Sequence, residues 1–233
     1  MNGLGLVWLG VGGFVGTHLL LSHPLRAPLV TRLGEKGFQG LYSLVAFATF
    51  GLMVWALKRI GPEALLWSPP GWAWPVASGI MLVASILLAG SMVGNPALPG
   101  MPHDSSGPRG VLAITRHPMM WGFALWALVH GLIWPQPSVL ILTGGIALLA
   151  LTGAAGQDAK KSRLQPDFWP GWRARTAFVP FTGPAPASAM WPGWRVLAAG
   201  VLLWLAATWL HPVAGAPTVG IWATAGDAAA VTA

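Results

Sequence analysis

The chain has 233 residues, of which 55% are hydrophobic and only 8% are charged. Soluble domains carry about a quarter charged residues, so this composition excludes an ordinary soluble protein. The formal net charge is +7, but the cations stand in segments between apolar runs, which is typical of membrane topology and not of a nucleic-acid-binding face. The chain has no cysteine, which excludes disulfides, thiolate nucleophiles and thiolate haem ligands.

Long uncharged stretches predict membrane-spanning helices. A helix that crosses the hydrocarbon core needs about 20 apolar residues. The expected spans lie near residues 4–21, 38–57, 72–93, 118–134, 138–156 and 196–210. No basic segment precedes the first of them, so we expect a retained helix and not a cleaved signal peptide. The sequence therefore predicts an all-α, polytopic membrane protein with one domain, residues 1–212, and a loosely ordered tail, residues 213–233.

The basic residues predict how these spans are oriented. If six spans alternate in direction, eleven of the 13 Lys and Arg residues fall on one side, and only Lys58 and Arg59 fall on the other. Positive residues gather on the cytoplasmic side of a membrane. Residues 157–195 are therefore expected to form a basic cytoplasmic loop, with both termini in the periplasm. We predict a multi-pass protein of the bacterial inner membrane.

Histidines are the side chains in these spans most able to carry chemistry. His18 lies near the end of the first span and His130 lies inside the fourth, and an ionisable residue at membrane depth marks a candidate functional site. His117 follows Arg116 at the start of the fourth span, and His211 closes the sixth at a depth close to that of His130. A neutral imidazole can ligate a metal or a haem iron. Hydrogen-bonding and helix-capping roles remain alternatives for these residues.

Two polar segments are expected to connect the first spans. His23-Pro24 directly follows the first apolar run and is typical of a helix end. Residues 32–38 are expected to form a solvated loop leading into the second span, where Glu35 caps the chain or pairs locally with Arg32. Both segments are therefore interpreted as connections between helices.

Four blocks of residues, in a fixed order along the chain, carry a resemblance to a known family. They are His18–Ser22 with Leu25-Arg26; Gly34–Phe38 with Leu41-Tyr42-Ser43; Thr115–Pro118 with Gly122, Trp126 and His130; and Asp167-Phe168 with Arg175-Thr176 and Val179–Phe181. A weaker fifth block is His211-Pro212. On these blocks the chain resembles the NnrU family of bacterial membrane proteins and its plant and cyanobacterial relatives, the 15-cis-zeta-carotene isomerases.

The resemblance implies a different function for each branch of the family. In the carotenoid branch, the protein holds haem b through histidines, and reduced haem iron assists rotation about the central double bond of a polyene in the bilayer. The ligands of that branch correspond to His130 and, with a one-residue insertion before Arg26, to His18. A cysteine proposed there as an alternative ligand is Ala127 here. In the bacterial branch, the protein is an accessory to the denitrification enzymes that reduce nitrite and nitric oxide, so whether this chain is an enzyme stays open.

Membrane depth favours another partner for His130. At 1.5 Å per helical residue, His18 and His130 differ in depth by about 15–20 Å, whereas a metal–imidazole bond is only about 2 Å long. His211 matches the depth of His130 better and is the alternative iron ligand; His18 matches His117 in the same way. Arg116 and His117 are expected to shape the cofactor pocket, with Arg116 holding a haem propionate through a charge-assisted pair.

Methyl transfer is a third alternative. Arg116-His117-Pro118, followed by Phe168, Trp172, Arg175 and Val179–Phe181, also looks like the C-terminal half of membrane methyltransferases that bind S-adenosylmethionine. Those proteins have a tyrosine where Met120 stands and two glutamates where Gln157-Asp158 stand, which counts against this activity. The resemblance still indicates that the cytoplasmic ends of spans four to six, near His117 and Asp158, form a pocket.

Overall fold

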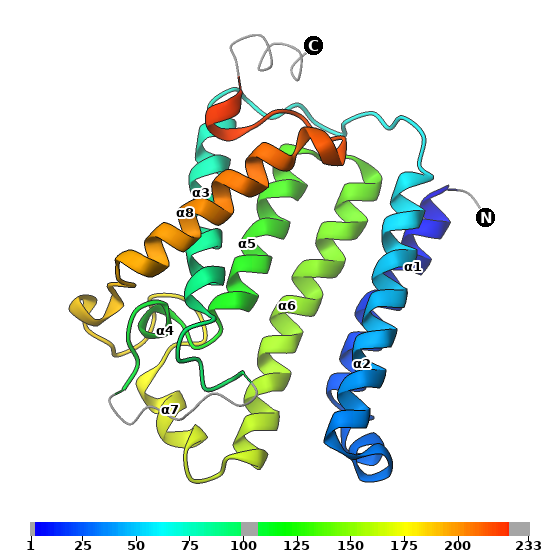
Figure 1. Cartoon of the computed structure of the whole chain (residues 1–233). Helices are drawn as coiled ribbons and strands as arrows, with labels where there is room; N and C mark the ends of the chain where they lie inside the picture. The colour runs from blue at the N-terminus through cyan, green and yellow to red at the C-terminus, as the bar shows by residue number, and fades with distance from the viewer. Residues whose placement is uncertain (1–2, 99–106, 224–233) are drawn as a thin grey trace.

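The computed structural model describes residues 3–98 and 107–223, and no strand occurs among them (Figure 1). The long helices are α1 (Gly3–Ser22), α2 (Arg26–Lys58), α3 (Ala73–Gly90), α5 (Pro118–Ile133), α6 (Pro137–Leu164) and α8 (Trp194–Leu210). The short elements are α4 (Val111–Ile114), α7 (Trp169–Arg175) and three 3-10 turns, η1 (Ala187–Met190), η2 (Pro212–Ala214) and η3 (Gly220–Trp222). The predicted all-α class is confirmed.

Four of the helices, α1, α2, α3 and α6, are long and apolar enough to span a membrane. Helices α5 and α8 are apolar but have 16 and 17 residues, which gives each a length of about 25 Å against a hydrocarbon core of about 30 Å. Large apolar side chains point outward from α2, where Phe47 is 76% and Leu44 is 68% exposed. Such a surface is stable only in an apolar solvent, so the prediction of a membrane protein is confirmed.

The helices pack as two groups joined through one pair (Figure 1). Helix α1 packs on α2 and α6, α3 packs on α5 and α8, and the antiparallel pair α5–α6 connects the two groups. The connections α1–α2 and α6–α7 lie at one end of the bundle, here called the lower end; the connections α2–α3 and α5–α6 and the end of α8 lie at the upper end.

Glycines let some of these helices approach closely. A Cβ atom on Gly200 of α8 would lie 2.7 Å from the Cα of Ile86 in α3. A Cβ on Gly10 of α1 would lie 2.9 Å from the Cα of Met53 in α2. Small residues at helix contacts are typical of membrane proteins, where close van der Waals packing takes the place of the hydrophobic effect.

Helix α2 begins at Arg26 and not at Phe38, so the predicted solvated loop is largely helical. Its first turn contains Pro28, which is tolerated there because no backbone donor is needed. Gly34 then breaks the helix with φ 70°, a conformation that glycine adopts without strain. The break places Glu35 beside Arg26, whose Nη2 lies 2.6 Å from its carboxylate, so the predicted local pair of Glu35 with Arg32 is wrong.

Helix α6 extends beyond the predicted span, to Leu164. The first part of the predicted loop 157–195 is therefore helix, and α7 and η1 lie in the rest of it. The polar residues from Gln157 to Arg163 continue the helix out of the apolar region, which a boundary drawn by hydropathy alone does not detect. Beyond α8, Trp222 of the expected tail donates from Nε1 to the Thr208 hydroxyl at 3.0 Å, and residues 224–233 lie outside the described residues.

At the upper end, Glu63 from the α2–α3 connection holds the start of α6. Its carboxylate oxygens accept the backbone N–H of Ser138 at 3.2 and 3.3 Å, and the Ser138 hydroxyl also donates to it. The side-chain amide of Gln136 donates to the Glu63 carbonyl at 2.9 Å. An anionic side chain at a helix N-terminus satisfies free N–H groups and complements the helix dipole, so Glu63 acts as a cap supplied from another connection.

Candidate functional site

The start of α5 and the lower part of α6 meet in a buried ionic cluster of Arg116, His117 and Asp158. Arg116 donates from Nε and Nη2 to the Asp158 carboxylate, with nitrogen–oxygen distances from 2.6 to 3.0 Å. His117 Nε2 lies 2.9 Å from Asp158 Oδ1. None of the three residues is more than 7% exposed. The three side chains thus form one buried network between α5 and α6.

The local chain path explains why this cluster forms. Before α5, Thr115 is extended, and its hydroxyl donates to the Phe178 carbonyl at 2.8 Å. The backbone N–H of Arg116 donates to Ala177 O at 2.9 Å, and Trp121 Nε1 donates to Phe178 O at 2.8 Å. These bonds fasten the segment after α7 to the start of α5. The cluster thus stabilises the junction between two distant segments of the chain.

The cluster leaves few polar atoms for a ligand. The third guanidinium nitrogen of Arg116, Nη1, donates to Thr176 O at 3.1 Å, so all three nitrogens are engaged. The Phe178 ring lies 5.3 Å from the His117 ring and 5.4 Å from the Arg116 guanidinium carbon, which closes the cluster on that side. Only Nδ1 of His117 is buried without a partner. This geometry is that of a packed structural contact.

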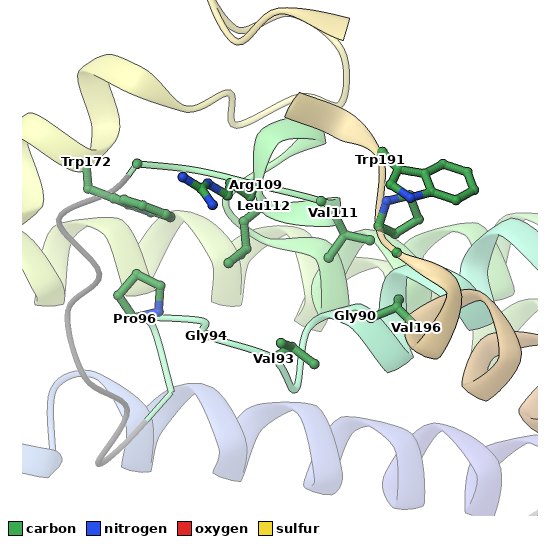
Figure 2. Close-up of a pocket in the computed structure, with 14 residues that line it drawn as sticks. Gly90, Val93, Gly94, Pro96, Arg109, Val111, Leu112, Trp172, Trp191 and Val196 are labelled. Atoms are coloured by element: carbon green, nitrogen blue, oxygen red, sulfur yellow. The ribbon is translucent and has the colours of Figure 1, made fainter. Parts of the chain in front are cut away.

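A pocket lies near this cluster, but neither His117 nor Asp158 lines it. It has a volume of about 250 Å³. Figure 2 shows Trp172 and Arg109 on one side of it and Trp191 and Val196 on the other. The methyltransferase resemblance predicts a pocket near His117 and Asp158; the structure has a pocket in that region, but both residues are buried and do not line it.

At the upper end, His130 of α5 and His211 at the end of α8 lie together. Their ring centres are 6.1 Å apart and their planes are within 9° of parallel. His130 Nδ1 lies 2.8 Å from Trp126 O, and His211 Nδ1 lies 3.0 Å from Ala207 O. A bond to a carbonyl requires the proton on Nδ1, so Nε2 is the unprotonated nitrogen of each neutral ring. The Trp126 ring stacks on His130 at 4.3 Å.

His18 is anchored in the same way but lies elsewhere. Its Nδ1 is 2.8 Å from Phe14 O, and the two rings are 4.1 Å apart. His18 lies near the lower end of α1, whereas His130 lies near the upper end of α5, and α6 packs against both helices (Figure 1). The structure therefore brings His130 to His211 and does not bring it to His18.

His23, which sequence reasoning interpreted only as part of a helix end, packs against α6. Its imidazole fills the space that a Cβ on Gly156 would occupy. Its Nε2 is buried without a partner. Burial, followed by the nearby Lys160 and Arg163, lowers the pKa of His23 below its ordinary value of 6.5. His23 is therefore a packing contact between the α1–α2 turn and α6.

An apolar groove of about 480 Å³ lies between α5 and α6. Its polar side-chain atoms already have partners: Trp67 Nε1 donates to Leu132 O, Trp121 Nε1 to Phe178 O, and the Thr143 hydroxyl to Val139 O. The groove therefore favours a hydrocarbon occupant. The lining residues on α5 lie from about 60° (Ala127) to about 200° (Leu128 and Leu132) around the helix from His130, and His130 itself does not line the groove.

Helices that expose apolar side chains outward and keep their polar clusters at the two ends of the bundle define a polytopic helical membrane protein. The family is given by a match of residues 6–218 to the family model described as NnrU protein. Because the match covers most of the chain, the protein belongs to the NnrU family, which confirms the resemblance. No curated protein and no solved structure matches the chain.

Proposed function

We propose that this protein binds haem b in the membrane and that His130 is a ligand of the haem iron. The observation that carries the proposal is the anchoring of His130: Nδ1 is fixed on the Trp126 carbonyl, and Nε2 is left for a ligand. Metal-ligating histidines typically donate their other ring nitrogen in this way. Among the described residues no group of three or more His, Cys, Asp or Glu could hold a metal ion, but haem iron needs only one or two axial ligands from the protein.

The proposed topology has six spans, with both termini in the periplasm of a bacterium and the protein in the inner membrane. Helices α5 and α8 both pack on α3, which is long enough to span by itself, and this supports a membrane-crossing role for the two shorter helices. Lys160, Lys161 and Arg163 end α6 at the lower end, whereas Lys58 and Arg59 lie at the upper end of α2. The excess of positive residues supports a cytoplasmic lower end.

For the reaction, we propose cis–trans isomerisation of a polyene such as 15-cis-zeta-carotene. Family membership and the apolar groove support it. Bound haem would supply a redox-active iron, while the chain fixes the imidazole tautomer and offers a hydrocarbon surface that excludes polar solutes. A polyene can enter such a groove sideways from the bilayer.

A second candidate is a non-catalytic accessory role toward denitrification enzymes. The position of the groove favours it, because His130 does not line the groove. Methyl transfer is the weakest candidate, since Arg116, His117 and Asp158 are committed to one another.

An absorption spectrum of the detergent-purified protein, from cells supplied with a haem precursor, tests the proposal. We expect a Soret band, with sharpened bands after dithionite, and its loss or shift in His130→Ala. A featureless spectrum at full haem supply would overturn haem binding. For haem-loaded protein, liquid chromatography of 15-cis-zeta-carotene after incubation separates the two candidates: a changed isomer ratio supports catalysis, and an unchanged ratio supports the accessory role.

A further inference from the structure

We infer that the lower end of the bundle binds an anionic phospholipid, whose phosphate lies where Lys160 and Arg163 of α6 face the turn between α1 and α2. This site would take a lipid whether or not the protein binds haem. It is formed by one face of α6 that changes from apolar to cationic along the helix.

That face of α6 packs on α1 and on the turn that follows α1. A Cβ on Gly145 would overlap a valine of α1, and the position of a Cβ on Gly156 is filled by the His23 imidazole. With about 100° between successive residues of a helix, positions 145, 156, 160 and 163 fall within about 60° of one another. Lys160 and Arg163 therefore continue the contact face beyond Gly156, toward the α1–α2 turn.

Positive charges from three segments gather on this face. Arg26 begins α2 three residues after His23, and Lys160 lies within electrostatic range of Arg26 and Lys161. Lys160 and Arg163 both act on His23. Lys160 is partly buried, so water screens its repulsion from these neighbours less than it would at an open surface. A cluster of this kind is stabilised by a counter-charge.

The described residues supply little of that counter-charge. Glu35 faces Lys160, but its carboxylate is already bound to Arg26, with Nη2 at 2.6 Å. Asp158 lies on the other side of α6, where it is bound to Arg116. In residues 3–98 and 107–223 no ion pair involves Lys160 or Arg163. These two cations are therefore left for an anion from elsewhere.

The position of the two cations relative to the bilayer favours a lipid as the source of that anion. The apolar stretch of α6 ends near residue 156, and Lys160 and Arg163 lie about 6 and 10 Å further along the helix axis. The headgroup region extends about 5–8 Å beyond the hydrocarbon core on each side, so the two side chains reach the level of the lipid phosphates. A Cβ on Gly153, on the same face, would meet nothing within 4 Å, which leaves room for an acyl chain.

The chemistry of the two side chains fits a phosphate. Arg and Lys form charge-assisted hydrogen bonds with phosphate oxygens, and basic pockets between membrane helices bind anionic headgroups. A zwitterionic lipid has the same phosphate but carries its own positive charge, which the cations around Lys160 repel. We therefore expect the site to prefer a lipid with a net negative charge.

Lipid titration of the full chain in detergent tests this site. Wild-type protein would be titrated with dioleoyl phosphatidylglycerol and, separately, with dioleoyl phosphatidylcholine, and bound lipid would be followed by native mass spectrometry and by thermal unfolding. We expect tighter binding and a larger rise in unfolding temperature with phosphatidylglycerol. The double variant Lys160→Gln/Arg163→Gln should bind phosphatidylglycerol roughly 25-fold more weakly, at about fivefold for each cation.

A matched control removes two cations from the same end of the bundle. Arg109 precedes α4 and Arg175 ends α7, and both elements lie on the other side of α6 from α2 (Figure 1). Arg109→Gln/Arg175→Gln should keep the wild-type preference for phosphatidylglycerol. The charge-retaining variant Lys160→Arg/Arg163→Lys should keep it as well, and size-exclusion chromatography shows whether each variant is folded.

Three outcomes would overturn the lipid site. Equal affinity of the wild type for the two lipids would remove the preference for an anionic headgroup. An equal loss in the two double variants would mean that general surface charge, and not Lys160 and Arg163, attracts the lipid. In a third arm, sodium phosphate replaces sodium chloride at the same ionic strength; if it stabilises the wild type as much as phosphatidylglycerol does, the site takes a free anion. None of these readouts uses haem, so failure of the proposed function leaves them unchanged.

Discussion

The two ends of α5 use histidine in opposite ways. At the lower end, His117 gives Nε2 to Asp158 and is enclosed by Arg116 and Phe178. Near the upper end, His130 gives Nδ1 to the Trp126 carbonyl of its own helix, and Nε2 takes no part in that bond. The two histidines therefore differ both in the ring nitrogen that the protein engages and in burial, since His117 is 2% exposed and His130 is only partly buried.

Removing the carboxylate of Asp158 should have the largest effect on stability and should leave the upper end unchanged. Asp158→Ala leaves Arg116 buried without its counter-charge, which costs about 3–5 kcal/mol. Thermal or denaturant unfolding in detergent measures the loss. The matched control is Asp167→Ala, which removes an exposed carboxylate from the same end and should change stability by less than about 0.5 kcal/mol. Equal losses in both variants would show that the cluster is not structural.

A methyl group at Gly156 should produce the next largest effect, also at the lower end. Gly156→Ala places Cβ in the space of the His23 imidazole, and such overpacking costs about 1–3 kcal/mol. The double variant with His23→Ala removes the overlap, so the two substitutions should be non-additive in unfolding measurements. Additive losses would mean that His23 does not pack against α6 in solution.

Hydropathy predicted the existence of the helices well because long apolar runs admit little else in a membrane. It failed at the polar extensions. Residues 26–37 and 157–164 carry charges, and only hydrogen bonds within the helix and tertiary contacts show that they are helical. The break at Gly34 is readable as a glycine, but its φ of 70° depends on how the two parts of α2 pack.

The sequence predicted how deep in the membrane the candidate site residues lie, but not which neighbouring side chains they face. Counting residues along the spans placed His130 and His211 at a similar depth, whereas only the packing of α5 and α8 on α3 shows that the two rings face each other. Asp158 lies 42 residues from Arg116, so their contact depends on how α5 and α6 cross. Glu63 had no local signal, because it caps a helix that begins far along the chain.

Loss of the cap at the upper end tests whether that end is held by polar contacts as the lower end is. Glu63→Ala removes the acceptor of the Ser138 N–H and hydroxyl, and loss of a helix cap costs about 1 kcal/mol. Glu35→Ala is a suitable control, since its pair with Arg26 is half-exposed and such pairs contribute about 0–1 kcal/mol. Unfolding in detergent should rank Glu63→Ala as the more damaging; the reverse order would contradict the capping role.

The smallest expected effect is a pH dependence at the lower end. Burial, together with Lys160 and Arg163, holds the pKa of His23 below 6.5 in the folded protein. The unfolded chain therefore binds more protons than the folded chain as the pH falls below 6.5, so this contribution to stability is complete above that pH and is lost below it. We expect the unfolding temperature in detergent to fall more between pH 7.5 and pH 5.5 in the wild type than in His23→Gln. These two pH values lie about one unit above and below the ordinary pKa of histidine, so the imidazole of the unfolded chain is mostly neutral at the first and mostly protonated at the second. Lys160→Ala should reduce the same difference by removing a neighbouring positive charge. If His23→Gln leaves the difference unchanged, another group controls the acid sensitivity, and His23 is no more than the steric partner of Gly156.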